Sequence, residues 1–116
     1  MKYRLWCKNK NEWEKDSWVI LPNGNIAWTK CGNIVGCANP KNHKLGRSIG
    51  LKDKSNKDIY EGDIVKTKEY IGQIIYSKGM FFIDVKGDFY LPVYNVSEFM
   101  EVIGNIYENP KLLERE

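Results

Sequence analysis

The stretch that decides the fold is GLKDKSNKDIYEGDIVK, residues 50–66 of a 116-residue chain. Its first turn contains Ser55 and Asn56, whose short side chains bond nearby backbone groups and favour turns. Asn also tolerates a positive φ at modest cost. We therefore predict a hairpin between residues 48–51 and residues 58–60, with Gly50 and Asn56 among its structural turn residues.

A second turn in the same stretch is formed by Gly62 and Asp63. Gly62 can adopt backbone angles that residues with a Cβ avoid, and the apolar pair Ile64 and Val65 follows at once. This order is typical of the first long strand of a small barrel. Asp63 has no acid or histidine at a spacing that implies catalysis, so we interpret both residues as structural.

Downstream, short segments of β-forming residues alternate with glycine-containing turns. The strands predicted from this pattern are residues 70–76, 80–85, 89–91 and 102–107. Gly72 predicts a bulge or bend, and Gly104 is counted with the structural turn residues. One short helix is predicted near residues 95–100, where Asn and Ser can cap it. Short strands joined by such turns favour a small barrel or sandwich.

The N-terminal part predicts a β-meander. Residues 2–6 alternate as a strand does. The apolar run at residues 18–21 is followed by Asn23-Gly24, a strong hairpin signal, and residues 26–29 are expected to pair back onto it. Residues 37–44 contain the Pro, Asn and Lys typical of an exposed loop. We place the boundary between the two parts of the chain there.

Composition bounds the class of protein. The length suits one domain or two small subdomains that share a core, and four Trp, seven Tyr and four Phe favour a folded chain. No apolar run approaches the ~20 residues of a membrane span, and no signal peptide is evident at the N-terminus. We therefore expect a cytoplasmic protein whose three cysteines are free thiols.

The candidate chemistry is sparse. Cys31, Cys37 and His43 are each six residues apart, which suggests zinc, but the gaps are longer than usual and only the distant Cys7 is left as a fourth ligand. The glycines are scattered, so no phosphate loop is predicted. Glu61 and Asp63 are two apart and are interpreted as a solvated turn. We expect no metal, no cofactor and no catalytic residue.

Charge is distributed unevenly, with a net +8 over residues 1–57 and −5 over residues 58–116. Such asymmetry suggests nucleic-acid binding or self-association. Small barrels can stack bases on aromatic side chains while basic residues follow the phosphates. The candidate nucleic-acid contacts are Lys2, Arg4, Lys8, Lys10, Lys41, Lys44 and Arg47. The tryptophans that could stack, such as Trp6 and Trp28, are better interpreted as core residues, as most aromatics in a small β protein are.

The stretch at residues 50–66, together with EVIGNIYENP at residues 101–110, Leu112-Leu113 and the opening KYRLW, resembles the YopX family of small proteins encoded largely by bacteriophages and prophages. The family usually has Asn-Gly in the hairpin turn, where this chain has Ser55-Asn56. The resemblance implies a mostly β fold with an SH3-like barrel in the C-terminal half. It implies no established activity and supplies no catalytic residue.

Together, these sequence patterns predict an all-β fold. An N-terminal β-meander (residues 1–48) is expected to pack with an SH3-like barrel (residues 49–116), as one cooperative unit. The predicted function is a non-catalytic protein-interaction or self-assembly module in the cytoplasm of a bacterial host cell, with itself or a host or phage protein as partner. The alternative is a nucleic-acid-binding protein that uses its basic, Trp-containing N-terminal half.

Overall fold

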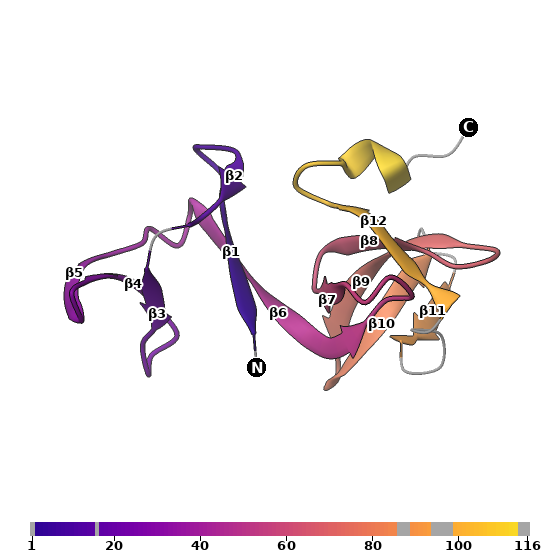
Figure 1. Cartoon of the computed structure of the whole chain (residues 1–116), viewed down its shortest axis with the longest axis horizontal. Helices are drawn as coiled ribbons and strands as arrows, with labels where there is room; N and C mark the ends of the chain where they lie inside the picture. Colours follow the sequence, from indigo (N-terminus) through magenta and orange to yellow (C-terminus); the bar gives the residue numbers. More distant parts are fainter. Residues whose placement is uncertain (1, 16, 86–88, 94–98, 114–116) are drawn as a thin grey trace. The chain divides into compact units, whose positions relative to one another are not determined.

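The computed structural model describes residues 2–15, 17–85, 89–93 and 99–113, and strands dominate this part of the chain (Figure 1). The all-β class is therefore confirmed. The elements are β1 (Tyr3–Cys7), β2 (Glu12–Trp13), β3 (Trp18–Ile20), β4 (Ile26–Lys30), β5 (Asn33–Cys37), β6 (His43–Lys52), β7 (Asp58–Tyr60), β8 (Asp63–Lys66), β9 (Ile71–Ser77), β10 (Met80–Val85), β11 (Phe89–Pro92), β12 (Glu101–Asn105) and the 3₁₀ helix η3 (Pro110–Leu113). In the described part, no helix is long and apolar enough to cross a membrane.

The chain divides into two compact units. The N-terminal unit is Arg4–Leu45, and the C-terminal unit is Met1–Tyr3 with Gly46–Glu116. Strand β6 is continuous through the division, because it begins at His43 and ends at Lys52. Whether the units fold as one cooperative body stays a prediction.

The C-terminal unit contains a five-stranded antiparallel sheet with the order β11-β10-β9-β8-β12. The predicted turn at residues 77–79 joins β9 to β10, and the predicted closing strand is β12, which pairs with β8. The hairpin predicted around Asn56 is also present, since β6 and β7 pair with Lys52 opposite Asp58. Asn56 has a φ of 67° and Gly50 a φ of 82°.

Aliphatic side chains on one side of this sheet form the larger core. Its buried members are Ile59, Val65, Ile74, Ile83, Val85, Val93 and Met100. Gly72 lies in regular register opposite Val65, so the predicted bulge is wrong. A Cβ at Gly72 would come within 2.7 Å of the Asp84 carbonyl oxygen, and close packing against β10 therefore explains the glycine.

The N-terminal unit is built differently from a single meander. Strands β3, β4 and β5 do form a three-stranded antiparallel meander around the predicted Asn23-Gly24 turn. Strand β1, however, pairs with β2 on one edge and with β6 on the other. The region predicted as a loop at residues 37–44 ends earlier than expected, because His43 already opens β6. The small core contains Leu5, Ile26 and Ala38, with Trp18, Trp28 and Leu45 packed against them.

Two carboxylates hold the turns of the opening stretch. Asp63 is 2% exposed, so it is buried rather than solvated as predicted, and its Oδ2 accepts a hydrogen bond from the Tyr60 amide at 2.8 Å. Asp53 is 6% exposed and accepts from the amides of Ser55, Lys57 and Val102, each at 2.9 Å. Asp53 thus ties the β6–β7 turn to β12, a role that the sequence did not reveal.

Close packing explains why two of the predicted turn residues are glycines. Gly62 has a φ of 85°, and a Cβ there would lie 3.4 Å from the Tyr107 ring. Gly104 lies in a register shift of β12 against β8, and a Cβ there would come within 2.8 Å of the Asn109 and Leu112 side chains. The helix predicted near residues 95–100 falls almost wholly outside the described residues.

Candidate functional site

One face of the β9–β10–β11 sheet carries exposed apolar side chains. Strand pairing places Ile75 opposite Phe82, Phe82 opposite Pro92, and Asp84 opposite Tyr90. Side chains alternate along a strand, so these residues point away from the core side chains Ile74 and Ile83. We call this surface the outer face and define it as Ile75, Ser77, Met80, Phe82, Asp84, Tyr90 and Pro92, with Lys78 in the connecting turn.

The outer face is hollowed and largely apolar. Its hollow has a volume of about 370 Å³ and is lined by Ile75, Ser77, Lys78, Phe82 and Tyr90. Tyr90 is 59% exposed and Met80 44% exposed, while the Phe82 and Tyr90 rings lie 6.2 Å apart between centroids. Exposed aromatic and methionine side chains that gather on one surface are characteristic of protein interaction sites.

A cation lies against the opposite face of the same hairpin. The Arg47 guanidinium lies 3.9 Å from the centroid of the Tyr76 ring and donates to Glu61 Oε1 at 2.7 Å. The hydrogen bond to Glu61 raises the pKa of Arg47 above its ordinary value, against the opposing effect of burial. The Arg47 guanidinium is therefore held in place by a carboxylate and an aromatic ring of the same chain, and its positive charge already has a partner within the protein.

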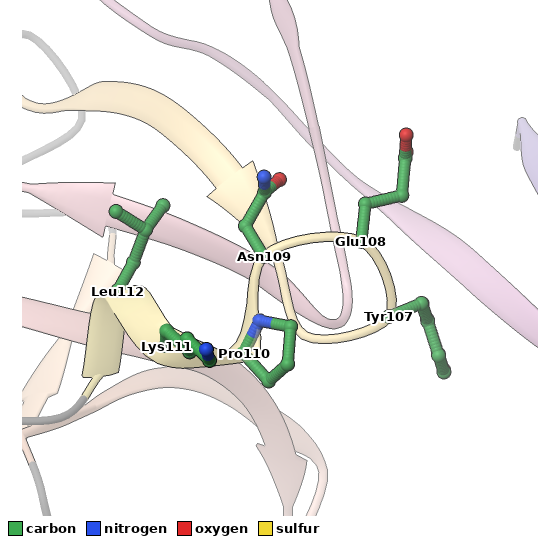
Figure 2. A pocket seen from close by; sticks show the side chains of 6 residues that line it. All are labelled: Tyr107, Glu108, Asn109, Pro110, Lys111 and Leu112. Carbon is green, nitrogen blue, oxygen red and sulfur yellow. The ribbon is translucent and has the colours of Figure 1, made fainter.

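The loop after β12 forms a second, more open hollow of about 560 Å³, lined by residues 107–112. The loop is held by Asn105, whose Oδ1 accepts hydrogen bonds from the amides of Tyr107 and Glu108. Figure 2 shows that the Glu108 and Asn109 side chains extend to the same side of the loop, whereas Tyr107 points away from them. Glu108 and Asn109 already hydrogen-bond to Asn105, so this hollow does not have the arrangement of a ligand site.

Four of the seven candidate nucleic-acid contacts are engaged with other side chains. Lys2 pairs with Asp58 at 2.9 Å, Lys10 with Glu14 at 3.2 Å, and Arg47 with Glu61. Arg4 lies 4.2 Å from the centroid of the Trp13 ring. Lys8, Lys41 and Lys44 are exposed.

The tryptophans of the basic half serve mainly as packing residues. Trp6 is 3% exposed, and its ring meets that of Trp13 edge-on, with centroids 4.9 Å apart. Trp18 and Trp28 pack against the small N-terminal core. A buried ring cannot offer a face on which a base stacks, so the core interpretation applies to Trp6.

The structure gathers different side chains around His43 from those that the sequence spacing suggested. Cys31 and Cys37 are exposed, whereas Cys7 is buried. The possible metal-ligand group among the described residues is Cys7, Glu14 and His43. Sequence reasoning missed Glu14, because only the pairing of β1 with β2 and β6 brings these three positions together.

The fold and the site define a small all-β protein with an exposed aromatic sheet face. The model of the family described as YopX protein matches residues 2–114, and the chain therefore belongs to the YopX family. No curated protein matches the chain.

Two solved structures are similar over nearly the whole chain. Protein yopX from Bacillus subtilis is 28% identical, with a TM-score of 0.68, over 98% of this chain and 96% of that one. Protein EF1440 from Enterococcus faecalis is 26% identical, with a TM-score of 0.67, over 97% of each chain.

Proposed function

We propose that this protein is a non-catalytic interaction module that self-associates through the outer face of β9–β11. The observation that carries the proposal is the hollowed apolar surface around Phe82 and Tyr90, with Met80 at its border. Apolar surface of this kind is stabilised when a second protein removes it from water. In this proposal the C-terminal unit is an SH3-like barrel and the protein is phage-type, working in the cytoplasm of a bacterial host.

The charges of the outer face favour a second copy of the same chain as its occupant. Lys78 lies in the turn before β10 and Asp84 lies near the other end of that strand. A two-fold axis brings residue i of one copy to residue j of the other, and j to i. Two outer faces docked with antiparallel β10 strands would therefore set Lys78 of each copy against Asp84 of the other, around an apolar centre.

The nucleic-acid alternative has less support. Lys2, Lys10 and Arg47 already pair with carboxylates of the same chain, and each phosphate contact would have to replace such a pair. By sequence, the N-terminal unit carries a net charge of +4 and the C-terminal unit −1. The difference between the units is smaller than the difference between the two halves of the sequence. The charge distribution therefore supports phosphate binding less than the outer face supports self-association.

The proposal is tested by the mass in solution of two matched variants. Tyr90 on the outer face and Ile34 on β5 are each 59% exposed, so Tyr90→Lys and Ile34→Lys introduce the same charge at equal exposure. We expect light scattering to give a multimer for the wild type and for Ile34→Lys, and a monomer for Tyr90→Lys. A wild-type monomer at every concentration, or equal masses for the two variants, would contradict it.

A further inference from the structure

The N-terminal unit brings three potential metal ligands together in a buried position. Cys7 is the last residue of β1, Glu14 follows β2 directly, and His43 is the first residue of β6. One ligand atom from each (Sγ, a carboxylate oxygen and a ring nitrogen) lies within 4.8 Å of the others. Cys7 is 3% exposed, and the side chains of Glu14 and His43 are 4% and 11% exposed.

Backbone hydrogen bonds fix this arrangement. The Glu14 amide donates to the Leu5 carbonyl at 2.8 Å, and the Lys8 amide donates to the Asn42 carbonyl at 2.7 Å. The first bond anchors Glu14 beside β1, and the second anchors the residue before His43 beside the end of β1. The three ligand positions are thus held by the strand framework rather than by long surface side chains.

The non-ligating atoms of Glu14 and His43 each have a partner. His43 Nδ1 lies 3.0 Å from the Asn39 carbonyl oxygen. A carbonyl oxygen only accepts, so Nδ1 carries the hydrogen of this bond, and Nε2 is the atom that faces Glu14 Oε2 at 2.9 Å. The other carboxylate oxygen, Oε1, accepts from Lys10 Nζ at 3.2 Å. Histidine and carboxylate ligands in metal sites are typically oriented by such outer hydrogen bonds.

The orientation of Nε2 has a direct electrostatic consequence. In the neutral ring with its hydrogen on Nδ1, Nε2 presents a lone pair, and that lone pair points at a carboxylate oxygen that also carries lone pairs. A metal ion placed between the two groups would accept both lone pairs and would in addition use the neighbouring Cys7 sulfur.

We propose that Cys7 Sγ, Glu14 and His43 Nε2 bind one divalent transition-metal ion, with zinc as the best match. A thiolate, an imidazole and a carboxylate all belong to the ligand set of zinc, and three protein ligands leave a fourth position open. On binding, the Cys7 thiol loses its proton to solvent. The ion would link β1, β2 and β6 in a unit whose apolar core is small, and so stabilise it.

The test uses the full chain with Cys31→Ser and Cys37→Ser, which leaves Cys7 as the sole thiol. Both replaced cysteines are exposed, so this double variant should fold. Titration with Co²⁺ is expected to give one bound ion per chain, with the near-ultraviolet charge-transfer absorption of a sulfur–cobalt bond. Zn²⁺ is expected to displace it and to raise the midpoint of thermal unfolding, because a ligand that binds the folded state stabilises it.

Further variants in this background assign the other ligands. Glu14→Gln and His43→Gln are expected to weaken Co²⁺ binding at least tenfold, whereas Lys44→Gln, an exposed neighbour of His43, leaves it unchanged. The proposal is overturned if the double variant binds no Co²⁺ or binds it without the sulfur absorption. That result would mean that a direct contact between His43 and Glu14 accounts for the cluster, and it does not depend on whether a Cys7 variant folds.

Discussion

The two units of this protein have different internal packing. Seven fully buried or nearly buried side chains, none of them larger than Met100, form the core of the C-terminal unit. The buried cluster of the N-terminal unit has three members, Leu5, Ile26 and Ala38, and depends on tryptophan rings packed around it. Both units have aromatic and polar contacts, but the C-terminal unit has the larger aliphatic core, and the small N-terminal cluster therefore depends more on the contacts around it.

The polar contacts of the N-terminal unit centre on Glu14. Burial by itself would raise the pKa of the Glu14 carboxyl, but the close contacts of the carboxylate with His43 and Lys10 outweigh it and hold that pKa below its usual range. The His43 ring also meets Trp28 edge-on, with centroids 5.3 Å apart. A buried carboxylate that is fully satisfied in this way fixes the positions of its neighbours.

The largest effects are expected from core truncations that compare the two units. Ile83→Ala should lower the free energy of unfolding by about 2–5 kcal/mol, the usual range for a fully buried isoleucine. Ile26→Ala, in the smaller and less enclosed cluster, should cost about 2 kcal/mol. Chemical denaturation monitored by circular dichroism measures both.

The same variants test whether the units unfold together. All four tryptophans lie in the N-terminal unit, so tryptophan fluorescence reports on that unit alone. If the chain is one cooperative body, Ile83→Ala shifts the fluorescence transition as far as the circular dichroism transition. If Ile83→Ala leaves the midpoint of the fluorescence transition unchanged, the two units fold independently.

Asp53 should give the next largest effect. Burial alone would raise the pKa of Asp53, but hydrogen bonds from the Val102, Lys57 and Ser55 amides outweigh it and lower that pKa. Asp53→Asn removes the charge and one acceptor position, and should cost about 1–3 kcal/mol at neutral pH.

The lowered pKa also fixes the pH dependence of the Asp53 contribution. The contribution of the ionised Asp53 to the free energy of unfolding is fully present above the ordinary aspartate pKa of about 3.9. It is lost as pH falls through the lower pKa of the folded state. The stability difference between wild type and Asp53→Asn should therefore be constant near neutral pH and shrink in acid. A difference that grows in acid would contradict this account of Asp53.

A charge exchange on the outer face should have a smaller effect. Lys78→Glu and Asp84→Lys should each weaken self-association a few-fold, as expected for a solvent-accessible ion pair, and the double variant should restore it. Sedimentation equilibrium measures the association constants. Weakening by the double variant equal to the sum of the two single effects would rule out the proposed antiparallel docking.

The smallest effect is expected at Lys2. Its pair with Asp58 is exposed, and exposed pairs add little to stability because water and salt screen them. Lys2→Met should leave the thermal midpoint of unfolding unchanged within error. A clear loss of stability would show that the N-terminal end of the chain has a larger structural role.

Local signals in the sequence predicted the C-terminal unit well. The turns at Asn56 and Gly62, the β9–β10 hairpin and the closing strand β12 all depend on residues near one another in the chain. Glycine at position 72 was misread, because a close approach between strands and a bulge both favour a residue without a Cβ. The distinction depends on the position of Asp84, twelve residues away.

The long-range pairings could not be read in the same way. Strand β6 pairs with β1 across more than thirty residues of sequence, and no turn between them sets that register. The cluster of Cys7, Glu14 and His43 follows from this pairing. The place of Asp53 next to Val102 depends on a separate long-range contact between the β6–β7 turn and β12. The outer face was equally hidden, since strand alternation predicts which residues share a face but not which face is left uncovered.

Self-association through the outer face is tested most directly by light scattering behind size exclusion, with and without single- and double-stranded DNA, at low and high salt. If self-association through the outer face is correct, the protein elutes as a multimer whose mass is unchanged by DNA and insensitive to salt. Phosphate binding would instead weaken steeply with salt. A monomer that comigrates with DNA only at low salt would contradict the account and assign the function to the basic N-terminal residues.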